Sequence, residues 1–138
     1  MMKRSGKLAA AQMRVWSLVG KRGVAGWCLK TCRQAWDLPS DDASAIDEWN
    51  SIPDHLKHPG DRNPPVGAPC FWEVGKFGHV AIAASKAGHV WSTDAPTKDR
   101  IGLVPIVWFK QNWKATYLGW SEEFQGQRLP LTPRKVKA

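Results

Sequence analysis

Two side chains in the sequence have the types that nucleophilic catalysis by a cysteine requires, a thiol and an imidazole. Cys28 follows a glycine-containing loop, residues 23–27, and opens a predicted helix. The free N–H groups and the positive dipole end of that helix favour the thiolate over the thiol. His79 begins a run that is otherwise apolar, so its imidazole is expected at the rim of a buried strand, facing a cleft. The pair predicts a cysteine nucleophile with a histidine as its base.

A neutral imidazole also needs an acceptor that holds its second N–H group. If residues 85–88 form the turn of a hairpin, residues whose numbers sum to 173 lie opposite each other, and this pairing sets His79 against Asp94. Directly opposed residues of an antiparallel pair share a face of the sheet. We therefore predict that Asp94 orients His79, whereas Ser92 lies opposite Ala81.

The first half of the chain has the periodicity of helices. One helix is predicted over about residues 6–19, a second from Cys28 to just before Pro39, and a short third after the capping residues 40–42. The apolar residues expected on these helices are Leu8, Ala11, Val15, Trp16 and Val19, then Leu29, Cys32 and Trp36, and finally Ala45, Ile46 and Trp49.

The second half changes to the shorter period of strands. Residues 53–69 are rich in Pro, Gly, Asp and His and predict a long surface loop. Four later segments are rich in β-branched or aromatic residues and predict strands at 70–74, 79–84, 90–94 and 116–120. Helices followed by strands argue for an α+β domain in which N-terminal helices pack on an antiparallel β-sheet.

Length and charge limit the organisation. A chain of 138 residues fits one domain, which we place at residues 1–126, followed by a basic C-terminal tail at 127–138. The formal net charge is +8, and cations gather at both ends, at Lys3, Arg4, Lys7, Arg128, Arg134, Lys135 and Lys137. Such ends either attract polyanions, for which anionic wall polymers would serve as well as nucleic acid, or are simply solvated tails.

A membrane partner is not expected from the sequence. Gln12 and Arg14 interrupt the apolar run near the N-terminus, so this run predicts neither a signal segment nor a membrane span. We therefore expect a soluble protein that is made in the cytoplasm.

Metal ions and other cofactors are not expected either. The three cysteines lack the spacing of a metal knuckle, and a zinc set of His55, His58 and Cys70 would have no fourth ligand. Helix capping accounts for Asp41 and Asp42 without a calcium ion. The predicted chemistry therefore depends on protein side chains alone.

Four short segments resemble a known family in their order and spacing. They are Gly-Trp-Cys-Leu-Lys around Cys28, Gly-Ala-Pro-Cys-Phe-Trp at 67–72, Gly-His-Val-Ala-Ile around His79 and Tyr-Leu-Gly-Trp at 117–120. Over about residues 8–126 the chain resembles the CHAP and NlpC/P60 peptidoglycan hydrolases, especially the endolysins of phages that infect actinobacteria. The Gly-His-Val-Ala-Ile segment is the most telling of the four.

The resemblance implies a papain-like fold and a bacteriolytic cysteine enzyme that acts on bacterial peptidoglycan. The bond cleaved is either the muramoyl-alanine amide or a peptide bond of the stem or cross-bridge, and the residues do not distinguish amidase from endopeptidase. The family's nucleophile falls on Cys28, its base on His79 and its third polar residue on Asp94 or nearby Ser92. Such an enzyme is expected to be a monomer and to reach the cell wall after release from the host cytoplasm.

Aromatic residues are candidates for a substrate groove. The chain has nine Trp and a single Tyr, and surplus aromatic side chains commonly line ligand grooves. Trp27 and Trp72 flank the predicted site in sequence. Together with Ser92 they are the candidate substrate-binding residues, and burial of the two Trp in the core is the alternative.

Two other classes of function stay open. The sequence pI of about 9.7 suggests nucleic-acid binding, although no helix carries a basic stripe and no helix-turn-helix, RRM or zinc-finger motif occurs. The other class keeps the same fold, either as an inactive wall-binding module or with an unrelated papain-like activity such as that of a protease or deamidase. The intact set of Cys28, His79 and Asp94 argues against an inactive module.

Overall fold

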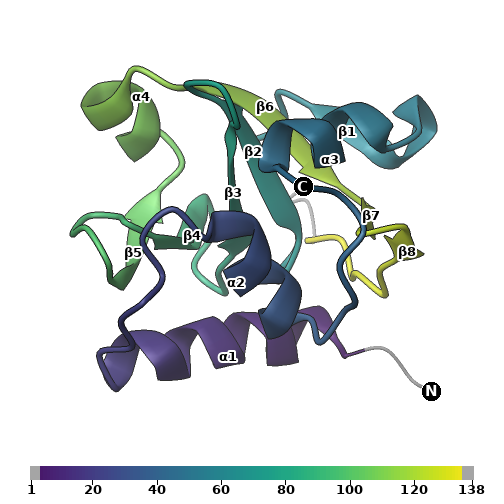
Figure 1. Ribbon diagram of the computed structural model, residues 1–138. Coiled ribbons are helices and arrows are strands. Elements are labelled where there is room, and N and C mark those ends of the chain that lie inside the picture. The colour runs from purple at the N-terminus through teal and green to yellow at the C-terminus, as the bar shows by residue number, and fades with distance from the viewer. Residues whose placement is uncertain (1–3, 135–138) are drawn as a thin grey trace.

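One antiparallel sheet of six strands organises the protein (Figure 1). The computed structural model describes residues 4–134. The strands of the sheet are β1 (Lys57–Pro59), β2 (Pro69–Glu73), β3 (His79–Ala83), β4 (His89–Thr93), β5 (Ile101–Pro105) and β6 (Thr116–Ser121). Their order is β1-β6-β2-β3-β4-β5, and a separate hairpin is formed by β7 (Glu123–Phe124) and β8 (Gln127–Arg128). The predicted α+β class with an antiparallel sheet is confirmed.

Helices cover both faces of this sheet. One core is shared by α1 (Gly6–Leu18), α2 (Cys28–Ala35) and α3 (Ala45–Ser51), whereas α4 (Trp108–Trp113) contributes Phe109 to the core on the other face. Because side chains alternate along a strand, Val80 and Ile82 of β3 enter the first core and Ala81 and Ala83 enter the second. All five residues of β3 are therefore buried.

The first helix packs through three small residues and Met13 rather than through its branched aliphatic residues. Its buried residues are Gly6, Ala9, Ala10 and Met13. Gly6 approaches the loop before β2 so closely that an added Cβ would lie 2.0 Å from the carbonyl oxygen of Val66. The helix covers the predicted span, but most of its predicted apolar stripe is exposed, namely Leu8, Ala11, Val15 and Val19. The reason is that only the small face allows the helix to lie so near the backbone of the domain.

The second helix agrees with its prediction. Leu29 and Cys32 are buried, and Trp36, directly after the helix, is buried with its indole N–H donating to the carbonyl oxygen of Gly67 at 2.9 Å. The spacing of apolar residues identified this helix because one face of it packs directly on the sheet.

The third helix begins later than its predicted caps. Its N-cap is Ser44, whose hydroxyl oxygen accepts from the backbone N–H of Asp47. Trp49 is buried as predicted, whereas Ile46 is only half-buried and Glu48 is buried in full. A buried carboxyl group replaces part of the expected apolar face, because it has hydrogen-bond partners in the C-terminal hairpin.

Several elements lie where the sequence predicted none. Residues 53–69 hold a single 3₁₀ turn, η1 (Asp54–Leu56), and strand β1 rather than an uninterrupted loop. Strand β1 pairs with β6, and the His58 ring stacks on Trp120 with 3.7 Å between centroids. The prediction also lacked β5 and α4, because β5 contains Gly102 and Pro105, which are typical of turns, and the six residues of α4 are too few for a clear helical period.

The segment after residue 126 packs on the domain instead of forming a separate tail. Strand β8 pairs with β7, Leu129 is buried, and the Arg134 guanidinium donates to the carbonyl oxygens of Pro64 and Ala84 at 2.8 and 2.6 Å. The predicted boundary falls in the β7–β8 turn, so the domain extends at least to Arg134. Of the predicted basic ends, three residues lie outside the described part of the chain: Lys3, Lys135 and Lys137.

We expect Gly6→Ala to destabilise the protein by about 1–3 kcal/mol, the usual cost of an extra carbon in a packed contact. Alanine ordinarily stabilises a helix relative to glycine, so a loss isolates the close approach to Val66. Urea denaturation followed by circular dichroism measures the shift in midpoint. Lys7→Ala at the exposed next position is the control and should leave the midpoint almost unchanged. An unchanged or higher midpoint for Gly6→Ala would contradict this packing.

Candidate active site

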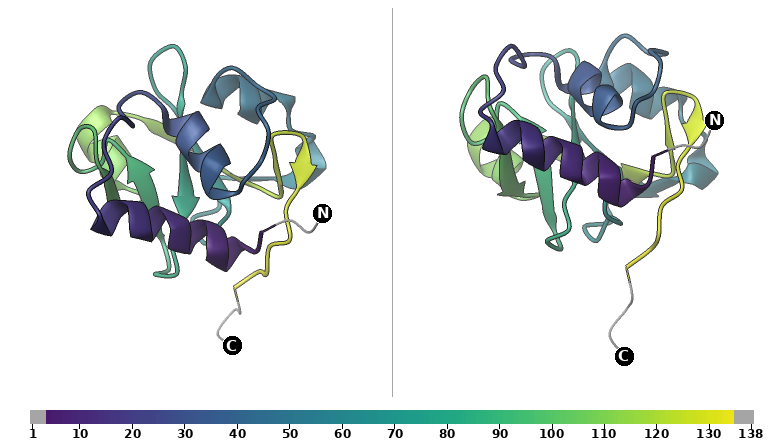
Figure 2. Two further views of the ribbon diagram at one scale, coloured as in Figure 1. Left: turned by 60° about the horizontal axis from the view of Figure 1, so that its bottom comes forward. Right: turned by 90° about the horizontal axis from the view of Figure 1, so that it is seen from below.

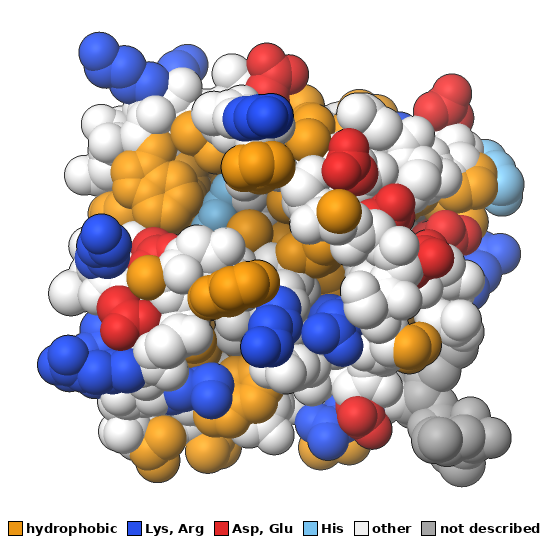
Figure 3. Space-filling view, viewed as in Figure 1, with side chains coloured by type: hydrophobic (Ala, Val, Ile, Leu, Met, Phe, Trp, Pro, Cys, Tyr) orange, Lys and Arg blue, Asp and Glu red, His pale blue; other side chains and the backbone are white. Residues whose placement is uncertain are grey.

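A cavity of about 760 Å³ opens beside α2, where Figure 3 shows a hollow surrounded by hydrophobic side chains. Its walls are the start of α2, the loop before α3, the turn between β2 and β3, and the last residue of α4. Cys28, His79 and Asp94 are all among its lining residues. The structure therefore brings the three predicted catalytic residues to one cavity.

The candidate nucleophile, Cys28, is the first residue of α2 and is half-buried. Burial raises the pKa of its thiol above the ordinary 9.0, and the Asp94 charge adds to this effect. Backbone hydrogen bonds from Val80 and Leu29 act in the opposite direction but do not outweigh burial. These effects oppose the thiolate that the helix start was predicted to favour, because loss of water around the sulfur costs more than the helix terminus offsets.

Two aspartates hold the loop that leads to Cys28. Asp99 Oδ1 accepts from the backbone N–H groups of residues 24 and 25 at 2.8 and 3.0 Å, and Asp94 Oδ2 accepts from Gly26 at 3.0 Å. Asp94 Oδ1 in turn accepts from the backbone N–H of Asp99 at 2.7 Å. These carboxylates fix three consecutive N–H groups just before the thiol. Sequence reasoning missed Asp99, because nothing in a surface turn shows which distant loop it contacts.

The candidate base, His79, is enclosed by three aromatic rings. The ring centroids of Trp113, Phe109 and Trp72 lie 4.9, 5.2 and 5.9 Å from that of the imidazole. Only 5% of the residue is exposed. Since the charged form loses its hydration here, burial lowers the pKa of His79 to about 3. The imidazole is therefore neutral at pH 7, as a general base must be.

The hydrogen bonds of Ser92 determine which nitrogen of His79 carries the proton. Ser92 Oγ lies 2.7 Å from Nε2 of His79 and donates to the carbonyl oxygen of Thr93 at 2.8 Å. A hydroxyl group has one proton, so Oγ must accept from the Nε2–H group. The other ring nitrogen, Nδ1, then carries the lone pair and is the atom that can accept a proton.

The prediction that Asp94 orients His79 is wrong, although the hairpin register behind it is correct. The positions at which β3 and β4 pair have numbers that sum to 173, as expected. Strand β4 ends at Thr93, and Asp94 turns out of the strand with a φ of 59°. Its carboxylate is thereby directed to the N–H of Gly26. Ser92, which stays in the strand, makes the bond to the imidazole instead.

Only one of the three predicted substrate-binding residues is exposed in the cavity. Trp27 lines it and is 57% exposed. Trp72 and Ser92 are buried and do not line this cavity; Trp72 packs against the His79 ring, and Ser92 bonds to it. Sequence reasoning missed Phe77 and Trp113, which line the cavity from a turn and from the unpredicted α4.

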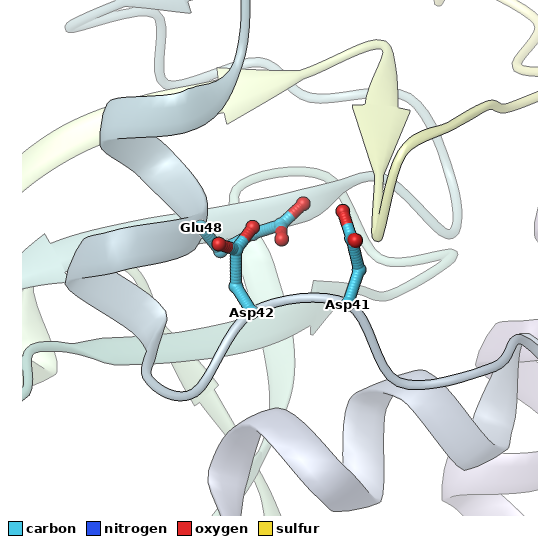
Figure 4. A group of neighbouring side chains, drawn as sticks. All are labelled: Asp41, Asp42 and Glu48. Atoms are coloured by element: carbon cyan, nitrogen blue, oxygen red, sulfur yellow. The ribbon is translucent and has the colours of Figure 1, made fainter.

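Three acidic side chains come together next to the cavity (Figure 4). Asp41, Asp42 and Glu48 bring carboxylate oxygens within 4.8 Å of one another, and oxygen ligands of this kind suit a hard cation. Glu48 accepts from the backbone and side-chain N–H groups of Gln125 at 2.6 and 2.7 Å. Burial, with a contribution from Asp42, raises the pKa of Glu48 to about 8. The loop before α3 forms one wall of the cavity. The bonds from Gln125 to Glu48 connect α3 to the β7–β8 turn.

The thiol and the imidazole line the same cavity, and both are neutral at pH 7. No hydrogen bond joins Cys28 Sγ to the His79 ring, whose Nε2 is bonded to Ser92. The pKa of the thiol is raised and that of the imidazole is lowered, and both shifts oppose an ion pair. Both shifts disfavour proton transfer from the thiol to the imidazole in the empty cavity, so such a transfer would have to accompany attack on a bound substrate.

We predict that alkylation of Cys28 by iodoacetamide accelerates about tenfold per pH unit between about pH 6 and 8.5, because the thiolate fraction rises in this way below the thiol pKa. Mass spectrometry of the modified peptide measures the rate. Cys28→Ser should remove the labelling, since Cys32 and Cys70 are buried in full. A rate that is already constant at neutral pH would reveal a stable thiolate and contradict the neutral thiol.

Comparison with known proteins identified no relative of this chain. No family model, no curated protein and no solved structure matches this chain.

Proposed function

We propose that the protein is a cysteine hydrolase that cleaves amide bonds of bacterial peptidoglycan. The observation that carries this proposal is the cavity shared by a thiol and a neutral imidazole whose Nδ1 is unprotonated. The segments around Cys28 and His79 resemble those of the CHAP and NlpC/P60 hydrolases. In this assignment, the packing of α2 on β3 corresponds to the papain-like arrangement of nucleophile helix and base strand.

The proposed reaction begins with proton transfer from Cys28 to Nδ1 of His79 as the sulfur attacks the amide carbon. The carbonyl oxygen gains negative charge, and the first N–H groups of α2, which have no acceptor within the helix, are placed to stabilise it. The imidazolium then protonates the departing amine, and a thioester remains. Water attacks the thioester with His79 again as base, which releases the carboxylic acid and restores the thiol.

The cavity walls suit a peptide stem that is attached to sugar. Trp27 and Phe77, 57% and 62% exposed, border the cavity with flat apolar surface against which sugar rings and peptide planes can stack. Lys30, Arg33 and Asp42 bring charges of both signs to the walls. Peptidoglycan stems carry both carboxylates and amines, so both signs have a counterpart in the proposed substrate.

Replacement of the nucleophile provides the first functional test. Cys28→Ala and Cys28→Ser should abolish lysis of purified walls, because no other exposed thiol lines the cavity. The loss of turbidity of a wall suspension measures lysis, and mass spectrometry of the released muropeptides identifies the bond. Cys32→Ala, one helical turn further on and buried, is the matched control and should retain most of the rate. Wall lysis by Cys28→Ala at the parent rate would refute the mechanism.

A second test separates orientation of the base from substrate binding. Ser92→Ala should lower kcat on the order of 10²-fold, the low end of the contribution of a general base, and leave KM almost unchanged. The ring would then lose the acceptor that keeps the proton on Nε2. Thr93→Val is the control, because it removes a neighbouring buried hydroxyl whose oxygen has no partner. Equal losses in the two variants would show that Ser92 acts only through packing.

A further inference from the structure

The outer face of α1 carries a stripe of bulky aliphatic side chains. Leu18 and Val19 are 73% and 71% exposed, and Leu8 and Val15 are 58% and 50% exposed. The small residue Ala11 is also exposed. At about 100° per residue, these five positions fall within roughly one third of the helix circumference, so they form a continuous surface.

The packing of the domain explains why this face stays uncovered. The opposite face of α1, with its small side chains, is the one that meets the sheet and α2. Figure 2 shows α1 on the outside of the molecule, with no other described element in front of it when seen from below. Exposed apolar surface of this kind marks a site that binds another protein or a membrane.

Positive charge is concentrated in the same part of the chain. Residues 1–36 contain eight Lys or Arg and no Asp or Glu, whereas the rest of the chain holds twelve of each sign, so the entire net charge of +8 belongs to this segment. Lys7 and Arg14 are exposed along one edge of the stripe. On its other edge, the half-buried Trp16 carries Lys21 over its ring at 5.4 Å.

We propose that the outer face of α1 binds the surface of an anionic lipid bilayer. The aliphatic stripe would enter the boundary between headgroups and acyl chains, and the flanking cations would contact lipid phosphates. Nucleic acid would satisfy the cations but leave the aliphatic side chains in water. A second copy of the chain would bring two cationic segments together. An anionic bilayer satisfies both features of the surface.

This mode of binding requires no membrane-spanning segment. Within residues 4–134, no helix has both the length and the apolar character needed to cross a bilayer. The sequence predicted no membrane partner, on the ground that it contains no spanning segment. Binding of α1 at the bilayer surface departs from that expectation and needs no span. With α1 along the lower edge of Figure 1 and the cavity on the face that Figure 3 shows, the cavity stays open while α1 is bound.

Sedimentation of the full chain with vesicles tests the proposal. Vesicles of phosphatidylglycerol and phosphatidylcholine should bind the protein, with less binding at high salt, and vesicles of phosphatidylcholine alone should bind it at least tenfold more weakly. Leu18→Gln with Val19→Gln should weaken binding to anionic vesicles about tenfold, because two exposed aliphatic side chains no longer enter the lipid. Lys7→Gln with Arg14→Gln should weaken it by a similar factor.

Matched variants elsewhere on the surface serve as controls. Lys76→Gln with Lys110→Gln removes the same charge from the β2–β3 turn and α4, away from α1, and Val107→Gln removes an exposed aliphatic side chain. These variants should bind vesicles within about twofold of the parent. Equal losses in control and α1 variants, or no binding of the parent, would overturn the proposal. A dimer in sedimentation velocity that Leu18→Gln with Val19→Gln dissociates would assign the face to self-association instead.

Discussion

The position of β3 in the interior of the sheet, with all five residues buried, is the constraint on which the rest of the structure depends. Because both faces of this strand must be covered, α1 and α2 occupy one face and α4 with the Trp72 ring occupies the other. His79 begins the strand on the face of α4, whereas the backbone of Val80 meets the sulfur of Cys28. Burial of a single strand thereby sets both the place of the candidate site and its electrostatics.

In a site with a thiolate–imidazolium ion pair, both charges exist before the substrate binds. Here the thiol and the imidazole are neutral, and charge would form only during the reaction. A buried imidazole next to an uncharged serine has no carboxylate to stabilise its protonated form, and Asp94 is occupied with the backbone at Gly26. In the proposed reaction, the imidazolium is stabilised mainly by the negative charge that forms on the substrate oxygen at the same time. A resting site of this kind keeps a weakly reactive thiol until a substrate fills the cavity.

The sequence predicted local features well and long-range ones poorly, for physical reasons. Alternation and turn length were sufficient for the register of β3 and β4, because both are properties of adjacent residues. The orienting residue was not predictable, since it depends on the left-handed backbone at Asp94 and on the distant loop that captures the carboxylate. The apolar face of α1 was predicted only from the spacing of its apolar residues. That spacing cannot show that Gly6 packs closely against the backbone of Val66, which turns the opposite face of the helix inward.

The strand order carries a consequence for synthesis of the chain on the ribosome. Strand β6 lies between β1 and β2, and Gln125 bonds both Glu48 and the backbone of Asp41. Neither the sheet nor the wall next to α3 can be completed until residues 116–125 have left the exit tunnel. The nascent chain therefore carries Cys28 and His79 well before the sheet that positions them is complete, so the cavity that they line can form only after residues 116–125 have emerged.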